Sequence, residues 1–392
     1  MIIDEFRGNS VSLLISTFQL FIIKYSIYAN KYTSPSPAVV YVKNMKIKTL
    51  GIGIWGTGVI AEFHAQALSE IPNVKLIAAY NRTPDKARAF SEKYKIGFAT
   101  TPEELLNNPA IDIICLCTAS GSHLEPALAC AQAGKHVIVE KPIEITLERC
   151  DQIISACHKA GVALGGILPR RFGHGAVALK SAIATGRFGK ITLASALIPW
   201  WRSQEYYDSA AWRGTQKLDG GGALMNQGIH TIDLLLWLLG PVKRVSATMG
   251  LVAHKNIEVE DIATGWIEFT NGARATIAGT TTCWSQNGLP AEIRIHGTTG
   301  SAILHDDRLV TFEFKESQSS DQSQIGKITQ GAGANDPKAI DTKWHKANLE
   351  EIIGAIRENK KPSIDGVEGR KAVELILALY QSAQQNGLPI NL

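Results

Sequence analysis

The stretch Lys48-Thr-Leu-Gly-Ile-Gly-Ile-Trp-Gly-Thr-Gly-Val-Ile-Ala61 joins a short apolar run to a cluster of glycines. The apolar run predicts a buried strand, and the glycines predict a tight turn into a helix that runs to about Ser69. Two glycine frames compete, because Gly51-x-Gly53-x-x-Gly56 also matches a dinucleotide fingerprint. We favour Gly56-x-Gly58-x-x-Ala61, since only this frame places its glycines at the end of the strand.

In that frame the turn is suited to a pyrophosphate. Gly56 makes the tight turn, Gly58 lets the backbone approach the phosphates, and Ala61 allows close packing of helix on strand. Backbone N–H groups at the start of the helix then face the phosphates. The candidate phosphate-binding residues are Gly56, Thr57, Gly58, Val59 and Ile60.

The next predicted strand, Val74 to Tyr80, ends at Asn81 and Arg82. A ribose-binding residue is expected about 20 residues beyond the glycines, and it is usually Asp or Glu in sites that prefer NAD. Asn81 carries no charge that repels a 2′-phosphate, and Arg82 can attract one or stack on adenine. The pattern leans towards NADP and leaves NAD open, with a solvated arginine as the alternative for Arg82.

Strand and helix patterns alternate from Ile47 to about Gly165, which predicts a parallel, doubly wound sheet. Ligands of such sheets bind beyond the carboxyl ends of the strands. Thr118, His123 and Glu140 follow two of these strand ends and are candidate cofactor contacts. Lys141, beside Glu140, can bind the cofactor, hydrogen-bond a substrate oxygen or shuttle protons. A surface loop lysine is the alternative.

The pattern changes after Val162, where successive short strands are separated by turns such as Asn271-Gly272. It predicts an antiparallel sheet with a helix, Ala178 to Thr185, on one face. A polar surface loop follows at 315–336, then two closing helices at 343–358 and 368–386. The expected fold is therefore α/β, with a dinucleotide-binding Rossmann domain at 45–165 and an α/β domain at 166–392 that carries an open, mainly antiparallel sheet.

The glycine triplet Gly220-Gly-Gly222 precedes a helical pattern that ends at Gly240. On a regular helix Asn226, His230 and Asp233 would share one face, because they are spaced i, i+4 and i+7. A histidine on an anchored helix is suited to proton transfer near neutral pH. The alternative is a core histidine with its hydrogen bonds satisfied.

Composition excludes several classes of protein. The chain has 392 residues, 45% hydrophobic and 19% charged, as expected for two globular domains. A net charge of +4 without a Lys/Arg cluster argues against nucleic-acid or membrane-surface binding. The six cysteines lack metal-ligand spacing, so we expect reduced thiols, no metal and a cytoplasmic protein.

Residues 1–44 do not match the rest of the chain. The apolar run from Val11 to Tyr28 is interrupted by Lys24, is short for a membrane span and lacks the features of a secretory signal. We interpret 1–44 as an extension outside the fold. A membrane tether is the alternative.

Taken together, the motifs resemble those of the glucose–fructose oxidoreductase, inositol dehydrogenase and rhizopine catabolism (Gfo/Idh/MocA) family. The resemblance spans roughly 45–392, and each motif is weak while their order and spacing are specific. The matching segments are Gly56-Thr-Gly-Val-Ile-Ala61, Ala131-x-x-Gly134-Lys-His-Val137, Glu140-Lys-Pro142, Arg170-Arg-Phe172, Gly220-Gly-Gly-Ala-Leu224 with His230 and Asp233, and Asp365-Gly-x-Glu-Gly-x-x-Ala372.

The resemblance implies hydride transfer between a nicotinamide cofactor, NADP or NAD, and a hydroxyl or carbonyl carbon of a sugar, cyclitol or sugar nucleotide. It also implies that the C-terminal sheet forms a homo-oligomer interface. The family's catalytic lysine and histidine correspond to Lys141 and His230. Many members have aspartate four residues before the histidine, where this chain has Asn226. Asparagine cannot relay a proton or supply a negative charge.

The implied mechanism gives the acid–base step to His230 and Lys141. His230 removes the hydroxyl proton, and Lys141 stabilises the developing alkoxide. Further residues would contact substrate or cofactor: Arg171, Trp212, Arg213, Asn226 and Asp233. Two alternatives are a catalytically silent, cofactor-binding regulator and an enzyme that cleaves its substrate through transient oxidation. The loops at 202–217 and 317–336 would define the substrate, which the sequence does not name.

Overall fold

The computed structural model describes residues 48–326 and 342–392, all within one compact unit, Ile47–Leu392. The expected extension at 1–44 lies outside the described residues. None of the described helices has the length and apolar character needed to cross a membrane.

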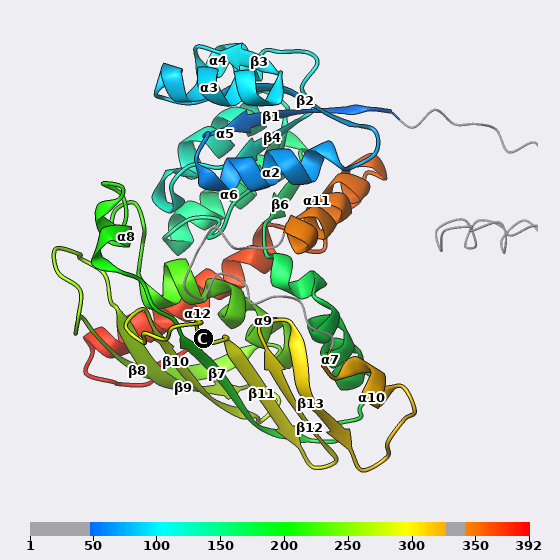
Figure 1. The fold of residues 1–392 in the computed structure, drawn as a ribbon, viewed down its shortest axis with the longest axis vertical. Coiled ribbons are helices and arrows are strands. Elements are labelled where there is room, and N and C mark those ends of the chain that lie inside the picture. The colour runs from blue at the N-terminus through cyan, green and yellow to red at the C-terminus, as the bar shows by residue number, and fades with distance from the viewer. Residues whose placement is uncertain (1–47, 327–341) are drawn as a thin grey trace, which may run out of the picture. The chain divides into compact units, whose positions relative to one another are not determined.

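The first half of the chain builds a six-stranded, entirely parallel sheet in the order β3-β2-β1-β4-β5-β6 (Figure 1). This is the strand order of a doubly wound dinucleotide-binding fold. The order reverses between β1 and β4, so ligands are expected beyond the carboxyl ends of these two strands. The strands are β1 Leu50–Trp55, β2 Val74–Tyr80, β3 Gly97–Ala99, β4 Ile113–Leu116, β5 His136–Val139 and β6 Leu164–Gly166.

Helices join these strands, and their ends follow from local sequence. The Thr146 hydroxyl accepts a hydrogen bond from Arg149 N–H and caps α6, which ends at the left-handed Gly161. All four residues of β4 are buried, as expected for a strand covered on both faces. The helices are α2 Val59–Ser69, α3 Pro84–Tyr94, α4 Pro102–Leu106, α5 Leu124–Gln132 and α6 Leu147–Ala160.

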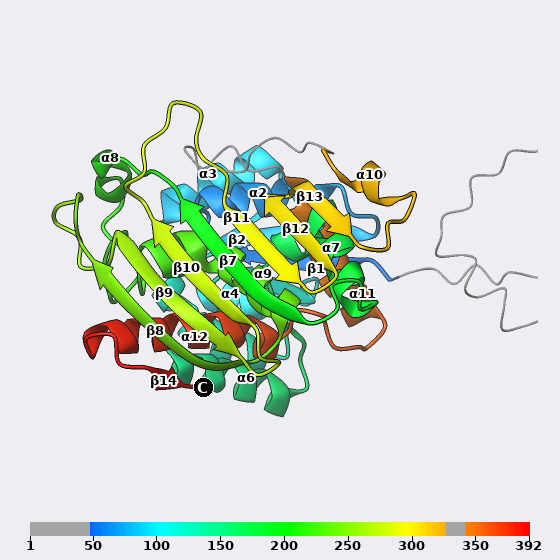
Figure 2. The same cartoon turned by 90° about the horizontal axis from the view of Figure 1, so that it is seen from below.

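The second half builds an eight-stranded sheet in the order β13-β12-β11-β7-β10-β9-β8-β14 (Figure 2). Every neighbouring pair is antiparallel except β7 with β10. The predicted α/β fold class, with a Rossmann sheet followed by a mainly antiparallel sheet, is therefore confirmed. The strands are β7 Ile191–Pro199, β8 Val242–Gly250, β9 Ile262–Phe269, β10 Arg274–Thr280, β11 Glu292–Gly297, β12 Gly300–His305, β13 Arg308–Phe314 and β14 Ile390–Asn391.

One face of this sheet packs against helices α7 His174–Ala184, α9 Ile229–Leu239 and α12 Gly366–Gln384. Strand β7 alternates accordingly: Ala194, Ala196 and Ile198 are buried, whereas Leu193 and Leu197 on its other face are 53% and 41% exposed. Alternation of this kind is what a strand covered on one face requires.

The C-terminal chain returns to the first sheet. Gly166 N–H donates to the carbonyl of Ile364, and α11 Thr342–Arg357 packs on α2. The expected closing helices are present as α11 and α12. A short helix, α10 Asp321–Gln324, lies within the segment 315–336 expected to be loop, held by an ion pair between Arg187 and Asp321. The remainder of that segment, 327–336, lies outside the described residues.

Candidate active site

The turn from β1 into α2 has the geometry expected of a phosphate cradle. Gly56 has a φ of +98°, and a Cβ there would lie 2.6 Å from the Cys117 carbonyl oxygen, so no other residue fits. A Cβ on Gly58 would meet no atom within 4 Å. Gly58 is the N-cap residue of α2, and no side chain caps the N–H groups there. An uncapped helix start beside open space fits a dinucleotide pyrophosphate.

Asn81 lies against this turn. Its Nδ2 donates to Thr57 Oγ1 at 2.8 Å, and its Oδ1 accepts from Thr83 N–H at 2.8 Å. The Asn81 side chain therefore ties the phosphate turn to the start of α3. The neighbouring Arg82 is exposed. Of the two residues expected near the ribose, Arg82 is the more exposed.

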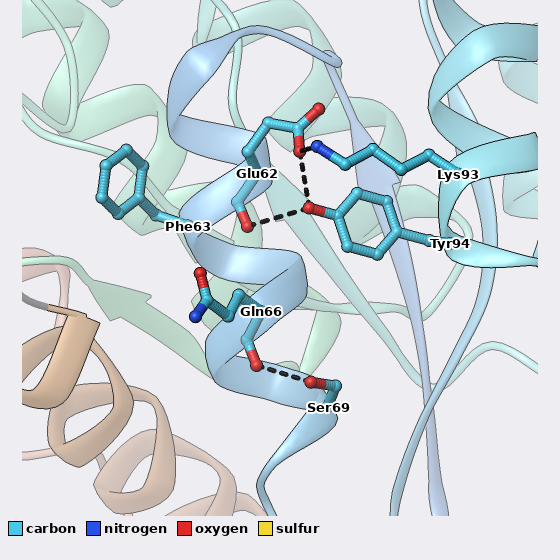
Figure 3. Close-up of a pocket in the computed structure, with 6 residues that line it drawn as sticks. All are labelled: Glu62, Phe63, Gln66, Ser69, Lys93 and Tyr94. Carbon is cyan, nitrogen blue, oxygen red and sulfur yellow. Dashed lines mark hydrogen bonds and ion pairs between the residues drawn. The ribbon is translucent and has the colours of Figure 1, made fainter. Parts of the chain in front are cut away.

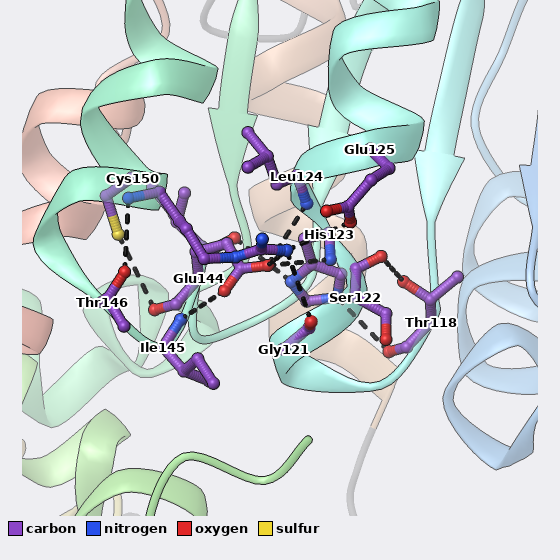
Figure 4. Close-up of polar contacts among 12 residues, drawn as sticks. Thr118, Gly121, Ser122, His123, Leu124, Glu125, Glu144, Ile145, Thr146 and Cys150 are labelled. Atoms are coloured by element: carbon purple, nitrogen blue, oxygen red, sulfur yellow. Dashed lines mark hydrogen bonds and ion pairs between the residues drawn. The ribbon is translucent and has the colours of Figure 1, made fainter. Parts of the chain in front are cut away.

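His123 has a different role from the one expected. Its ring is fully buried, with Nδ1 2.9 Å from the Pro142 carbonyl. Its Nε2 lies 3.3 Å from the carbonyl of Thr118, and Figure 4 shows these two residues side by side. Burial lowers its pKa, although the nearby Glu144 opposes the shift. The Thr118 hydroxyl donates to the carbonyl of Ser122. His123 thus braces the segments after β4 and β5, and its ring is not exposed to a cofactor.

Glu144 organises the same corner. Its carboxylate accepts backbone N–H groups from His123, Leu124 and Ile145, and also pairs with Arg149. Figure 4 shows these contacts converging on one buried carboxylate. Sequence patterns did not single out Glu144, because two of its partners, His123 and Leu124, lie 21 and 20 residues earlier in the chain.

Glu140 is also internal. Its Oε1 lies 2.6 Å from His64 Nε2, and its Oε2 accepts Lys141 N–H. Burial raises the pKa of Glu140, but His64 and neighbouring positive charges outweigh burial and lower it to about 2. The carboxylate therefore stays charged and links α2 to the segment that carries Lys141. It was expected to touch the cofactor, and the structure instead commits both its oxygens to the protein.

Lys141 meets Asn226 across the site. Lys141 Nζ donates to the Asn226 carbonyl at 2.9 Å and lies 3.5 Å from Asn226 Oδ1. The Lys141–Pro142 peptide bond is cis. Burial lowers the pKa of Lys141, opposed by the charges of Glu140 and Asp219. The Nδ2 of Asn226 donates to Asp219 Oδ1, which makes Asp219 the third member of this chain of contacts.

The prediction of a regular helix through Asn226 and His230 is wrong at the start of that helix. Ala223–Gly228 forms a π-helical segment, and α9 begins only at Ile229. The Glu260 carboxylate accepts the N–H groups of Gly222 and Leu224 and holds the entry of this segment. Short π segments occur often at functional sites. Here Asn226 is directed to Lys141 and Asp219.

His230 presents a half-buried imidazole whose Nδ1 is enclosed and makes no hydrogen bond within 48–326 and 342–392. Burial lowers its pKa well below the usual value, reinforced by the charges of Lys141 and Arg170. The imidazole is therefore neutral at neutral pH. A neutral histidine close enough to feel the Lys141 charge can accept a proton.

Arg171 and Asp233 satisfy each other. The guanidinium of Arg171 donates to both oxygens of Asp233, at 2.9 and 2.6 Å, and to Glu368. The two residues are only 7% and 1% exposed. Their expected contact with substrate is replaced by a buried ion pair that ties the turn Pro169–Phe172 to α9 and α12.

Arg213 differs from Arg171. Its guanidinium lies over the rings of Tyr206, 4.2 Å from the centroid, and Trp212, 4.6 Å from the centroid, and donates to the Tyr206 hydroxyl. Among the residues that the structure describes, no carboxylate lies within ion-pair distance of it. Its charge reaches Lys141 and lowers the pKa of that ammonium. Arg213 is therefore available to an anionic ligand.

A surface pocket lies elsewhere, on α2 and α3 (Figure 3). The Tyr94 hydroxyl donates to Glu62 there, and Lys93 pairs with the same carboxylate. None of the predicted site residues lines it. In 48–326 and 342–392 no cluster of His, Cys, Asp and Glu is placed to hold a metal ion.

Comparison with known proteins identifies the family of the chain. The model of an oxidoreductase family with an NAD-binding Rossmann fold matches residues 50–166, and that of the GFO/IDH/MocA C-terminal domain matches 176–303. A crystal structure of the WlbA dehydrogenase from Chromobacterium violaceum, in complex with NADH and UDP-GlcNAcA, is 32% identical. It covers 89% of this chain and 97% of its own, with a TM-score of 0.80.

The WlbA dehydrogenase from Bordetella pertussis, also in complex with NADH and UDP-GlcNAcA, is 30% identical over 88% of this chain and 98% of its own, with a TM-score of 0.79. The NADP-dependent scyllo-inositol 2-dehydrogenase IolW of Bacillus subtilis is 26% identical over 87% of this chain and 95% of its own. The chain therefore belongs to the Gfo/Idh/MocA family of oxidoreductases and carries that family's NAD-binding Rossmann domain.

Proposed function

We propose that this enzyme oxidises a ring hydroxyl of a nucleotide-linked sugar acid. The observation that carries the proposal is Arg213, a guanidinium without a carboxylate partner in the described chain, whose charge reaches Lys141. The similar dehydrogenases that bind UDP-GlcNAcA support an acidic, UDP-linked substrate. A sugar carboxylate or a phosphate provides the planar or forked acceptor that arginine prefers.

The proposed chemistry divides proton and hydride between protein and cofactor. When bound, the nicotinamide supplies the hydride acceptor. His230, kept neutral by burial and by the charge of Lys141, accepts the hydroxyl proton. We propose that Lys141 Nζ, which donates to the Asn226 carbonyl, also donates to the same substrate oxygen as negative charge develops there. Both residues are retained, which gives no support to a silent regulator.

A screen for reduced nicotinamide tests the proposal. We expect turnover with UDP-GlcNAcA and little or none with myo-inositol or with the uncharged UDP-GlcNAc. Arg213→Gln should raise the KM for the acidic substrate about tenfold or more, because one charge-assisted contact is lost. The matched control is Arg88→Gln, an exposed arginine on α3. Equal turnover of charged and uncharged sugars would contradict the proposal.

The same screen, run with NAD and NADP in parallel, tests the ribose end. Asn81 is engaged with Thr57 and Thr83, so we propose that Arg82 is the side chain that meets a 2′-phosphate. Arg82→Ala should then raise the KM for NADP more than that for NAD. Equal changes with both cofactors would leave adenine stacking as the role of Arg82.

A further inference from the structure

Asp219 is a buried carboxylate beside the reacting groups. It is 1% exposed, its Oδ2 accepts Gly214 N–H at 2.8 Å, and its Oδ1 accepts Asn226 Nδ2. Its own N–H donates to the Thr215 carbonyl, which fixes the turn that carries it. No role in the chemistry described above accounts for a charge buried at this point.

Asp219 decides the orientation of Asn226. A carboxylate only accepts hydrogen bonds, so the Asn226 amide must direct its NH2 group to Asp219 and its oxygen the other way. That oxygen, with the Asn226 backbone carbonyl, faces Lys141 Nζ. The contact chain therefore runs from carboxylate through amide to ammonium.

We propose that Asp219 supplies the negative charge that Asn226 itself cannot carry, and that Asn226 connects this charge to Lys141 through hydrogen bonds. Asp219 is thus a positioning residue: it orients the Asn226 amide and favours the protonated form of Lys141. The hydrogen-bonding roles of the pair are complementary, so exchanging the two residues conserves both the contact and the charge.

The electrostatics of the site agree with this role. Burial raises the pKa of Asp219 to about 6, opposed by the Gly214 hydrogen bond and by Lys141, so it is charged at neutral pH. After Glu140, its charge is the next largest influence that raises the pKa of Lys141. The titratable groups that interact with Asp219 are Lys141, Arg213, Tyr206, Tyr207 and Tyr380.

The first test is the reactivity of Lys141 towards acetic anhydride as a function of pH, measured by peptide mass spectrometry. Asp219→Asn should lower the midpoint of Lys141 labelling by about one pH unit, because a nearby negative charge is removed. The double variant Asp219→Asn/Asn226→Asp should restore it. The matched control is Glu258→Gln, with no shift expected: Glu258 is an exposed carboxylate between β8 and β9, and it accepts Gln216 N–H from the loop that carries Asp219. An unchanged midpoint in Asp219→Asn overturns the proposal.

The second test is turnover, and it rests on the proposed function. Asp219→Asn should lower kcat about tenfold or more with little change in cofactor KM, and the double variant should recover most of the loss. If Asp219→Asn does not fold, a folded double variant with wild-type Lys141 labelling supports the proposal, and one with a lowered midpoint refutes it. Lack of turnover by the wild type with every sugar nucleotide acid defeats the proposed substrate, while labelling still decides the role of Asp219.

Discussion

Burial lowers the pKa of both Lys141 and His230, but with opposite chemical results. For His230 it secures the neutral form that a base requires. For Lys141 it works against the charged form, and the carboxylates of Glu140 and Asp219 oppose it. The site therefore combines a base of lowered pKa with a lysine whose charged form is favoured by two neighbouring carboxylates, a division of roles that hydroxyl oxidation needs.

The first residue-scale prediction concerns these two groups. His230→Ala and Lys141→Ala should each lower kcat by roughly 100-fold or more, because each removes a proton-transfer or charge-stabilising contact. The dissociation constant of NADH, measured by fluorescence, should stay within a few-fold of the wild type. Near-normal turnover in both variants excludes the assignment.

The second residue-scale prediction concerns the loss of folding free energy caused by burying the charged Asp219 carboxylate. Its pKa is raised from 3.8 to about 6 in the folded state. The stability linked to this shift is complete below pH 3.8 and is lost as the pH rises through about 6. Asp219→Asn removes the penalty, so the difference in Tm between variant and wild type should be more positive at pH 8 than at pH 5. An identical difference at both pH values contradicts this prediction.

At the scale of elements, the sequence predicted what local rules determine. The Gly56 turn, the strands that follow it and the two closing helices arise from periodicity, glycine geometry and capping. The π segment at 223–228 was not predicted, because it depends on Glu260, which lies far along the chain. Asp219 was missed for the same reason, because Asn226 contacts Asp219 from within the π segment that the sequence did not predict.

The roles of His123, Glu140, Arg171 and Asp233 follow from tertiary partners in the same way. A strand end or a helix face can be read from the sequence, but the direction in which a side chain finds its partner cannot. For Arg171 that partner is Asp233 across the turn Pro169–Phe172 and α9, and for Glu140 it is His64 on α2. Burial keeps these charged partners together, because an unpaired charge inside a protein is costly in free energy.

The element-scale prediction tests whether the buried Arg171–Asp233 pair stabilises the fold. Asp233→Asn should lower the free energy of unfolding by about 3–5 kcal/mol, because it leaves the buried Arg171 guanidinium with only Glu368 as a carboxylate partner. The control is Glu358→Gln, part of an exposed pair with Lys360, for which the change should be about 0.5 kcal/mol or less. Urea denaturation followed by circular dichroism measures both. Similar small losses in the two variants would argue against a structural role for the Arg171–Asp233 pair.

At the scale of the molecule, the outer face of the large sheet is the candidate contact between copies of the chain. Trp266 pairs with Thr276, which pairs with Ser195, so Trp266 lies on the same face as Leu193 and Leu197. These three apolar side chains are 37%, 53% and 41% exposed.

The division of the chain into two domains at about residue 165 stays a prediction.

We expect the purified protein to be an oligomer through this face. Leu193→Glu with Trp266→Glu should shift the molar mass in size-exclusion chromatography with light scattering towards that of a single chain, because buried charges oppose association. Val252→Glu, at an exposed loop residue outside the strands, is the control. A wild-type mass equal to one chain would contradict the prediction.

The return of the C-terminal chain to the first sheet has a consequence for synthesis. During translation the strands of the first sheet emerge first. The Ile364 carbonyl that accepts Gly166 N–H, and the helix α11 that packs on α2, are synthesised much later. The nascent nucleotide-binding half therefore leaves the ribosome with one sheet edge and one helix face uncovered. A ribosome-bound chain halted before residue 342 should be sensitive to proteases and dependent on chaperones, and cofactor affinity should appear only once the last helices are released.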